Sequence, residues 1–237
     1  MKKQLLAALL ALSLTVPAAL LPAAAAGYYA NTLYPDTDLW GNRLEDMTPE
    51  QQQRARTERL AWYAWLASKY ASMSFEDVPK DSWFYEGVNY VWRNSLMSGV
   101  SDTSFAPNEV TNRAMVWTVL ARMQGASTAA AEGQAWYEPG AAWAVRQGLG
   151  DGSDPTGSIT REYLAEMLWK CVGGPLTPAD LSGFSDRGQV SGYAVNAVNW
   201  AVANGILKGS DGQLSPQGSV TRAELAAMVM RFKSLSY

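Results

Sequence analysis

The apolar positions of the chain fall into three similar segments with helical periodicity. They read WFYEGVNYVWRNSLMSG over residues 83–99, WYEPGAAWAVRQGLGDG over 136–152 and YAVNAVNWAVANGILKG over 193–209. The segments align without gaps, and each has aromatic residues at its first and eighth positions. Residues seven apart lie on one face of an α-helix, so each segment predicts an amphipathic helix. The glycine that closes each segment is expected to cap its helix in the left-handed conformation.

A second helical pattern follows each segment after a polar loop. The arginines that open these patterns are Arg113, Arg161 and Arg222. Apolar residues recur three, six, seven and ten positions after each arginine, which predicts a buried helical stripe. The residues before the arginines can cap a helix through a side-chain oxygen, and they are Asn112, Thr160 and Thr221. Glu224 lies three residues after Thr221 and completes a capping box.

The repeats are unequal, and the middle one is the most degenerate. Phe75-x-Asp77 and Phe184-x-Asp186 lead into the first and third repeats, whereas the second has no such motif. The second also has the shortest loop between its two helical patterns. We assign residues 75–125, 126–180 and 181–237 to the three repeats.

Composition excludes several kinds of chemistry. The 237 residues include no histidine and one cysteine, with a net charge of -3. Histidine-based catalysis, disulfides and a general basic surface for nucleic acid are therefore excluded. Cys171 occupies the last position of a buried stripe, and we expect it to fill the core rather than act as a nucleophile. The acidic loops lack the glycine spacing of an EF-hand, so no metal site is expected.

The N-terminus predicts a secretory signal peptide over residues 1–26. Lys2 and Lys3 precede an apolar run that ends in Ala23-Ala24-Ala25-Ala26, with cleavage expected before Gly27. The alternative is an uncleaved membrane anchor, for which the run is short. We therefore expect an exported protein on the cell surface, with no transmembrane segment after cleavage.

Residues 27–74 are expected to form an irregular arm followed by one helix. Thr48, Pro49 and Gln51 predict a helix start with a capping box, and the helix should end near Ser72. Its aromatic side includes Trp62, Tyr63 and Tyr70. Packing against the first repeat is favoured over a ligand platform.

The repeated pattern resembles the S-layer homology (SLH) module. Phe-x-Asp, an aromatic residue, an amphipathic helix and a Thr-Arg-Ala-Glu helix recur together, most completely at Val220-Thr221-Arg222-Ala223-Glu224. The resemblance covers residues 75–232. It implies an all-α fold of three helix–loop–helix repeats in a pseudo-threefold arrangement, here preceded by one N-terminal helix, with grooves between neighbouring repeats.

The resemblance also implies non-covalent anchoring to the bacterial cell envelope. SLH modules bind secondary cell-wall polysaccharide, commonly pyruvylated, and some bind modified peptidoglycan. Carried onto this chain, the candidate glycan-binding residues are Arg113, Arg161, Arg222, Trp83, Trp136, Tyr193, Asp77, Asp186, Gly99, Gly209, Thr221 and Glu224. No cofactor, catalytic residue or nucleic-acid partner is expected.

The role of the three arginines has two readings. Free N–H groups and the positive end of the helix dipole make a helix N-terminus suited to an anion, and an arginine there adds charged donors. Each arginine could therefore bind the carboxylate of a wall sugar. Alternatively, it could pair with Asp77 or Asp186 and join the repeats.

Two other functions remain open from the residues alone. The repeats could bind a protein partner or self-associate into a surface layer. An enzyme would have to rely on carboxylates acting on glycans, and no pair of them is fixed by spacing. We therefore expect a non-enzymatic protein whose small remainder outside the repeats is suited to an adaptor.

Overall fold

The computed structural model describes residue 38 and residues 42–70 and 73–235, with no side-chain description for residues 60 and 62–70. The chain divides into two compact units, residues 1–73 and 74–237. In the first, a 3₁₀ turn (η1, Leu44–Asp46) precedes α3 (Pro49–Tyr70). The predicted capping box is confirmed: the Gln51 N–H donates to Thr48 Oγ1 (3.3 Å) and the Thr48 N–H to Gln51 Oε1 (2.9 Å).

Three predictions for the N-terminal part lie outside the described residues. They are the signal peptide, the arm up to residue 37 and the aromatic side of α3.

The second unit is built from six helices of 9 to 12 residues. In chain order they are α4 (Tyr85–Arg93), α5 (Arg113–Met123), α6 (Glu138–Arg146), α7 (Arg161–Lys170), α8 (Val195–Ala203) and α9 (Arg222–Lys233). Two 3₁₀ turns, η2 (Arg187–Gln189) and η3 (Gly192–Ala194), precede α8. Every regular element in the described part of the chain is a helix, which confirms the all-α prediction.

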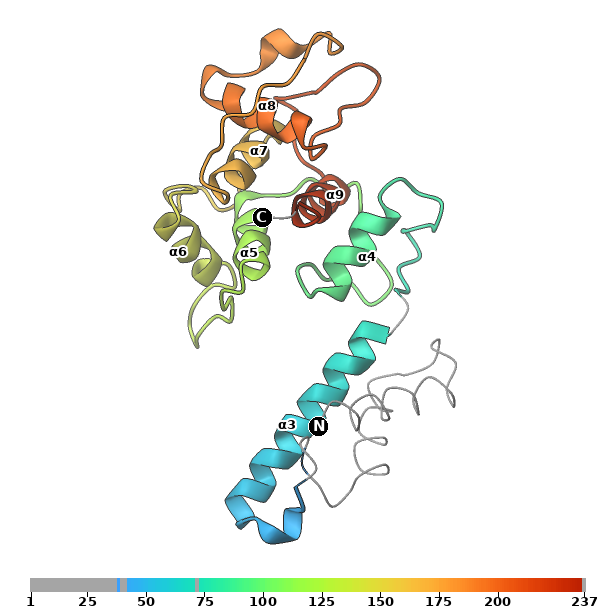
Figure 1. Ribbon diagram of the computed structural model, residues 1–237, viewed down its shortest axis with the longest axis vertical. Coiled ribbons are helices and arrows are strands. Elements are labelled where there is room, and N and C mark those ends of the chain that lie inside the picture. Colours follow the sequence, from blue (N-terminus) through green and yellow to red (C-terminus); the bar gives the residue numbers. More distant parts are fainter. Residues whose placement is uncertain (1–37, 39–41, 71–72, 236–237) are drawn as a thin grey trace. The chain divides into compact units, whose positions relative to one another are not determined.

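The helices pair between repeats rather than within them. α5 packs on α6, α7 on α8, and α9 on α4, so the last helix of the chain closes a ring with the first helix of the first repeat. Figure 1 shows α5, α7 and α9 around the middle of this unit, with α4, α6 and α8 outside. Small residues allow two of these close contacts. A Cβ on Gly87 would lie 2.9 Å from the Ala227 backbone, and one on Gly140 would lie 2.8 Å from Thr118 Oγ1.

Three isolated β-bridges connect the starts of α5, α7 and α9, which we call the central helices. They pair Val110 with Thr221, Asn112 with Ser158, and Thr160 with Ser219. Each bridge joins two of the three repeats, and together they join all three. The residue before the loop proline adopts a left-handed conformation in every repeat, at Ala106, Asp154 and Ser215. The pseudo-threefold arrangement therefore extends to the backbone, including the degenerate middle repeat.

The expected helix ends were wrong. The outer helices α4, α6 and α8 end at Arg93, Arg146 and Ala203. The left-handed residues that follow them are Ser95, Gly148 and Gly205. In each case the next residue donates back to the helix, as the Leu96 N–H does to the Val91 carbonyl (2.8 Å), which is a Schellman motif. The glycines four residues later lie in the loops.

The core is formed mainly by the stripes of the central helices. Val116, Leu120, Leu164, Leu168, Leu225 and Val229 are completely buried. At the interface of the first and second repeats, a large residue on the helix packs against a glycine in the loop. Trp117 is 1% exposed, and a Cβ on Gly150 would lie 3.6 Å from its Nε1. At the position of Trp117, the other two repeats have Ala165 and Ala226. At the position of Gly150, they have Leu207 and Met97. The large residue is therefore on the helix in this interface and in the loop in the other two.

Candidate functional site

The N-termini of the central helices are not open anion sites. In α9, the Arg222 and Ala223 N–H groups donate to the carbonyls of Glu109 and Pro107 (both 2.9 Å). The same two positions of α5 donate to the middle repeat, and those of α7 to the third. The third N–H of each helix donates to its cap residue. The expectation of free N–H groups is therefore wrong, because the neighbouring loop already supplies acceptors.

Arg222 joins the third repeat to the first. Its side chain is buried, and Nε and Nη2 donate to the carbonyls of Phe105 (2.7 Å) and Ser98 (2.8 Å). The guanidinium carbon also lies 4.6 Å from the centre of the Phe105 ring. Arg222 thus holds the loop of the first repeat through carbonyl oxygens, so neither reading of this arginine from the sequence included its main contacts.

The other two arginines occupy the same position with different partners. Arg161 donates from Nε to the Leu214 carbonyl (2.8 Å) and forms an ion pair with Glu224 of the α9 capping box. Arg113 faces the shorter middle loop, where Nε is buried without a hydrogen-bond partner and Nη1 lies 3.8 Å from Asp154 Oδ2. Arg113 is therefore the least satisfied of the three.

Asp77 and Asp186 stabilise the loops of their own repeats. Asp77 accepts hydrogen bonds from the Ser104 hydroxyl and from the N–H groups of Phe105 and Ala106. Asp186 accepts from the N–H groups of Leu214 and Ser215 (2.8 and 2.7 Å). Burial opposes ionisation, but these donors lower the pKa of both carboxyl groups below their usual values.

Gly99 and Gly209 are required by close packing against the lead-in phenylalanines. A Cβ on Gly99 would lie 2.5 Å from the Phe75 ring and 2.3 Å from the Ser101 carbonyl oxygen. A Cβ on Gly209 would lie 2.8 Å from the Phe184 ring and 2.4 Å from the Gln213 carbonyl oxygen. The structure thus gives these two predicted site residues a packing role.

The three predicted aromatic residues are exposed at equivalent positions. Trp83, Trp136 and Tyr193 lie two residues before α4, α6 and α8, and they are 63%, 53% and 57% exposed. Trp83 and Trp136 each make an edge-to-face contact with the next ring, Phe84 or Tyr137. Indole faces on the surface suit stacking against the apolar face of a sugar.

Tyr193 contacts the start of α7. Its hydroxyl donates to Glu162 Oε1 (3.0 Å), and Glu162 is the second residue of α7. The same carboxylate accepts from the Ser191 N–H (2.9 Å) and from Gln217 Nε2 (2.8 Å). The arginine that precedes Glu162 reaches Leu214 and Glu224 instead. The Tyr193 hydroxyl therefore binds the second residue of α7 rather than its arginine.

Glu162 is a functional candidate that the sequence reasoning missed. It is 1% exposed, yet burial is outweighed by hydrogen bonds from Ser191, Gln217 and Tyr193, which lower its pKa. Burial and the adjacent Glu162 charge raise the pKa of Tyr193 to about 12. The signal was available in the sequence, because Glu162 stands where α5 and α9 have Ala114 and Ala223.

We define three equivalent sites by the central helix that contributes to each. The α7 site contains Tyr193, Glu162 and Gln217. The α9 site contains Trp83, Ala223 and Asn108, and the α5 site contains Trp136, Ala114 and Thr156. Equivalence rests on the second N–H of each helix, which donates to the loop proline just before Gln217, Asn108 or Thr156. Only the α7 site contains a carboxylate at the helix position.

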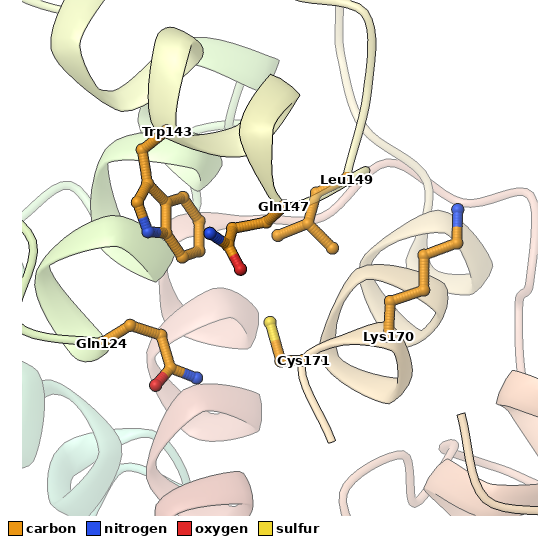
Figure 2. Close-up of a pocket in the computed structure, with 6 residues that line it drawn as sticks. All are labelled: Gln124, Trp143, Gln147, Leu149, Lys170 and Cys171. Atoms are coloured by element: carbon orange, nitrogen blue, oxygen red, sulfur yellow. The ribbon is translucent and has the colours of Figure 1, made fainter. Parts of the chain in front are cut away.

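A separate pocket lies at the other ends of α5, α6 and α7. It has a volume of about 290 Å³ and is lined by Gln124, Trp143, Gln147, Leu149, Lys170 and Cys171 (Figure 2). Cys171 was expected to be core filling, but it is only partly buried, whereas Met123 and Phe232 at the equivalent positions are buried. Burial raises the pKa of the thiol to about 11, so the group is protonated and a poor nucleophile.

The described residues contain neither a metal-binding cluster nor a membrane-spanning helix. No group of three or more Cys, Asp or Glu side chains in this part of the chain is arranged to hold a metal ion. No helix there is both long and apolar enough to cross a membrane.

Comparison with known protein families identifies the first and third repeats. Residues 74–114 and 183–226 match the family model of the S-layer homology domain. Residues 115–182, which include both helices of the middle repeat, lie between the two matches. The resemblance inferred from the sequence is therefore confirmed for two segments.

Similar proteins include surface proteins and enzymes. S-layer protein sap of Bacillus anthracis is 30% identical over 68% of this chain and 21% of its own length. Amylopullulanase of Thermoanaerobacterium thermosulfurigenes is 27% identical over 88% and 12%, respectively. Exoglucanase XynX of Acetivibrio thermocellus is 26% identical over 67% and 16%. The chain thus spans 12% to 21% of the length of these relatives.

Proposed function

We propose that this chain is a non-enzymatic module that anchors to the bacterial cell envelope by binding an acidic wall glycan. The family matches and the S-layer relatives support envelope anchoring in general. The same region also occurs in relatives named as glycan-degrading enzymes, which fits a module that is independent of any one activity.

The observation that carries the glycan proposal is the exposure of Trp83 and Trp136 at equivalent positions of two repeats. Each indole lies on the surface at a site whose central helix contributes only an alanine, Ala223 or Ala114. A sugar ring can stack on the exposed face of either indole. A pyruvylated sugar, with one carboxylate, hydroxyl groups and an apolar face, has the matching chemistry.

The arginines have unequal parts in this proposal. Arg222 is buried and committed to carbonyls, so it positions the loop of the α9 site. Arg113 is partly exposed and its Nη1 has only a long ion pair with Asp154 (3.8 Å), which makes it the arginine best placed to contact an anionic ligand directly. Thr221 and Glu224 act as the α9 cap, and Asp77 holds the loop that precedes Asn108.

Co-sedimentation of the purified protein with wall glycans tests the proposal. We expect binding that falls when pyruvate is removed chemically, and that falls when Trp83 or Trp136 is replaced by alanine. Leu176→Ala is the matched control, because Leu176 is 79% exposed but lies outside the three sites. Two sites on a repeating polymer should reinforce one another, so the double tryptophan variant should lose most of the binding.

The competing function is protein assembly. Failure to bind any wall glycan, together with concentration-dependent oligomers in analytical ultracentrifugation, would replace glycan anchoring with self-association.

A further inference from the structure

We infer that Glu162 is a built-in occupant of the α7 site, where its carboxylate takes the place that the carboxylate of a ligand takes at the α9 site. This inference rests on the proposed function and deepens it. It assigns specificity to one residue and reduces the number of working sites from three to at most two.

The first step is the chemistry around Glu162. Its two oxygens accept three hydrogen bonds, from a backbone N–H, a phenol hydroxyl and a side-chain amide. All three donors belong to the third repeat, whereas Glu162 belongs to the second. The third repeat therefore contains a complete receptor for one carboxylate, and the second repeat delivers that carboxylate from the start of α7.

The second step is that the scaffold around this receptor is repeated. The Glu162 N–H donates to the Pro216 carbonyl (3.0 Å), as the Ala223 N–H donates to that of Pro107 (2.9 Å). α8 packs on α7, as α4 packs on α9. By this register, the Ser191 N–H corresponds to that of Asp81, and the Gln217 amide to the amide of Asn108.

The third step is the difference in side chains. Ala223 ends at Cβ, so the α9 site contains no internal carboxylate. Trp83 replaces Tyr193, and an indole presents a larger stacking face than a phenol whose hydroxyl is committed to Glu162. The α9 site thus has an amide and a backbone donor at the equivalent positions and lacks the internal anion.

A ligand carboxylate is excluded from the α7 site for two reasons. The donors there are already used, and a second carboxylate beside an ionised Glu162 would be repelled. The α7 site is therefore closed to acidic glycans, and Glu162 instead joins the second and third repeats.

Chemical rescue with sodium acetate tests this inference without any wall glycan. Glu162→Ala removes a methylene group and a carboxylate, which are the heavy atoms of acetate. We expect the variant to have a lower melting temperature than the wild-type protein, and acetate to raise it in a saturable manner. Sodium chloride at equal ionic strength should not have this effect.

Two controls make the test specific. Glu166 lies on the same helix, and its carboxylate pairs with Lys170. Acetate should not rescue Glu166→Ala beyond the effect of chloride. Glu162→Gln keeps the side chain's volume and should not respond to acetate either.

Every outcome decides the inference. If acetate, but not chloride, raises the melting temperature of Glu162→Ala in a saturable manner, or if this variant folds only in acetate, the receptor is confirmed. It is overturned if the variant responds equally to acetate and chloride, fails to fold at any acetate concentration, or gains no more than Glu166→Ala does. Rescue by acetate combined with no glycan sedimentation would keep the receptor and remove glycan anchoring, so the two proposals fail separately.

Discussion

The starts of α7 and α9 share one backbone arrangement and differ in what occupies it. Both helices have a threonine cap, an arginine at their first position and N–H groups bonded to a neighbouring loop. At the second position α7 has Glu162, which is buried under Tyr193 and Gln217, whereas α9 has Ala223. In the proposed function, this single side chain separates a site that satisfies itself from one that can receive a ligand.

The first two residues of each central helix have different roles. The arginine repeats at all three helices because each holds, or faces, the loop of the next repeat. The residue after it is glutamate in α7 and alanine in α5 and α9, and we propose that this position faces the ligand site. The repeated arginine indicates the positions that join the repeats. Glu162, the one departure from alanine at the next position, indicates the position to which we assign specificity.

The largest expected effect is on stability at the α9 end of the comparison. Arg222→Ala removes two hydrogen bonds from a buried guanidinium and leaves two loop carbonyls without donors, which should lower the free energy of unfolding by about 3 kcal/mol. Arg113→Ala removes only a long ion pair and should cost about 1 kcal/mol or less. Urea denaturation of both variants checks this, and equal losses would show that Arg222 is not the main connection between the third and first repeats.

A smaller effect is expected on binding. Trp83→Ala should weaken glycan binding roughly tenfold, which corresponds to about 1.4 kcal/mol, because the stacking face is lost. Tyr193→Ala should leave glycan binding nearly unchanged, since the α7 site is closed. Isothermal titration with a wall-glycan fragment measures both, and a Tyr193 variant as weak as the Trp83 variant would make the two sites equivalent.

The pH dependence of stability should also distinguish the two helices. The pKa of Glu162 is lowered in the folded state, so its stabilising contribution is present above its unfolded pKa and is lost as the pH falls through the folded pKa. Glu162→Gln should flatten the loss of stability that sets in as the pH falls below the ordinary glutamate pKa of 4.5, leaving the part due to Asp77 and Asp186. Unfolding titrations at several pH values check this, and parallel curves for variant and wild type would contradict an ionised Glu162.

The smallest effect is expected at the helix caps. Thr160→Ala and Thr221→Ala each remove one cap hydrogen bond and should cost about 1 kcal/mol. Thr221→Ala should cost slightly more, because α9 has a reciprocal capping box and α7 has none. Thermal unfolding resolves the difference, and a larger loss at Thr160 would mean that the box adds nothing to α9.

Local features of the fold were predictable from the sequence. Cap residues, apolar stripes and the all-α class depend on interactions within a few residues, and these predictions are confirmed for α5, α7 and α9. The ends of the outer helices were misplaced because Ser95 gave no glycine signal, and because Gly148 and Gly205 were passed over for later glycines. Two of the later glycines, Gly99 and Gly209, are required by tertiary contacts with Phe75 and Phe184, which no local pattern contains.

The pairing of helices and the roles of the arginines were not predictable. The contact of α4 with α9 joins segments more than a hundred residues apart, and periodicity does not specify a partner. The acceptors of Arg222 are backbone carbonyls, which every residue has. Glu162 could have been found, because a glutamate at a position that is alanine in the other two repeats is a departure visible in the sequence.

The most direct test of the central claim is to give α9 the side chain that closes α7. Ala223→Glu should retain the helix content by circular dichroism and lose glycan binding at the α9 site in isothermal titration, while Glu162→Ala retains binding there. If Ala223→Glu is folded and binds the glycan fragment as the wild-type protein does, the residue after the arginine does not control the site, and the account is wrong.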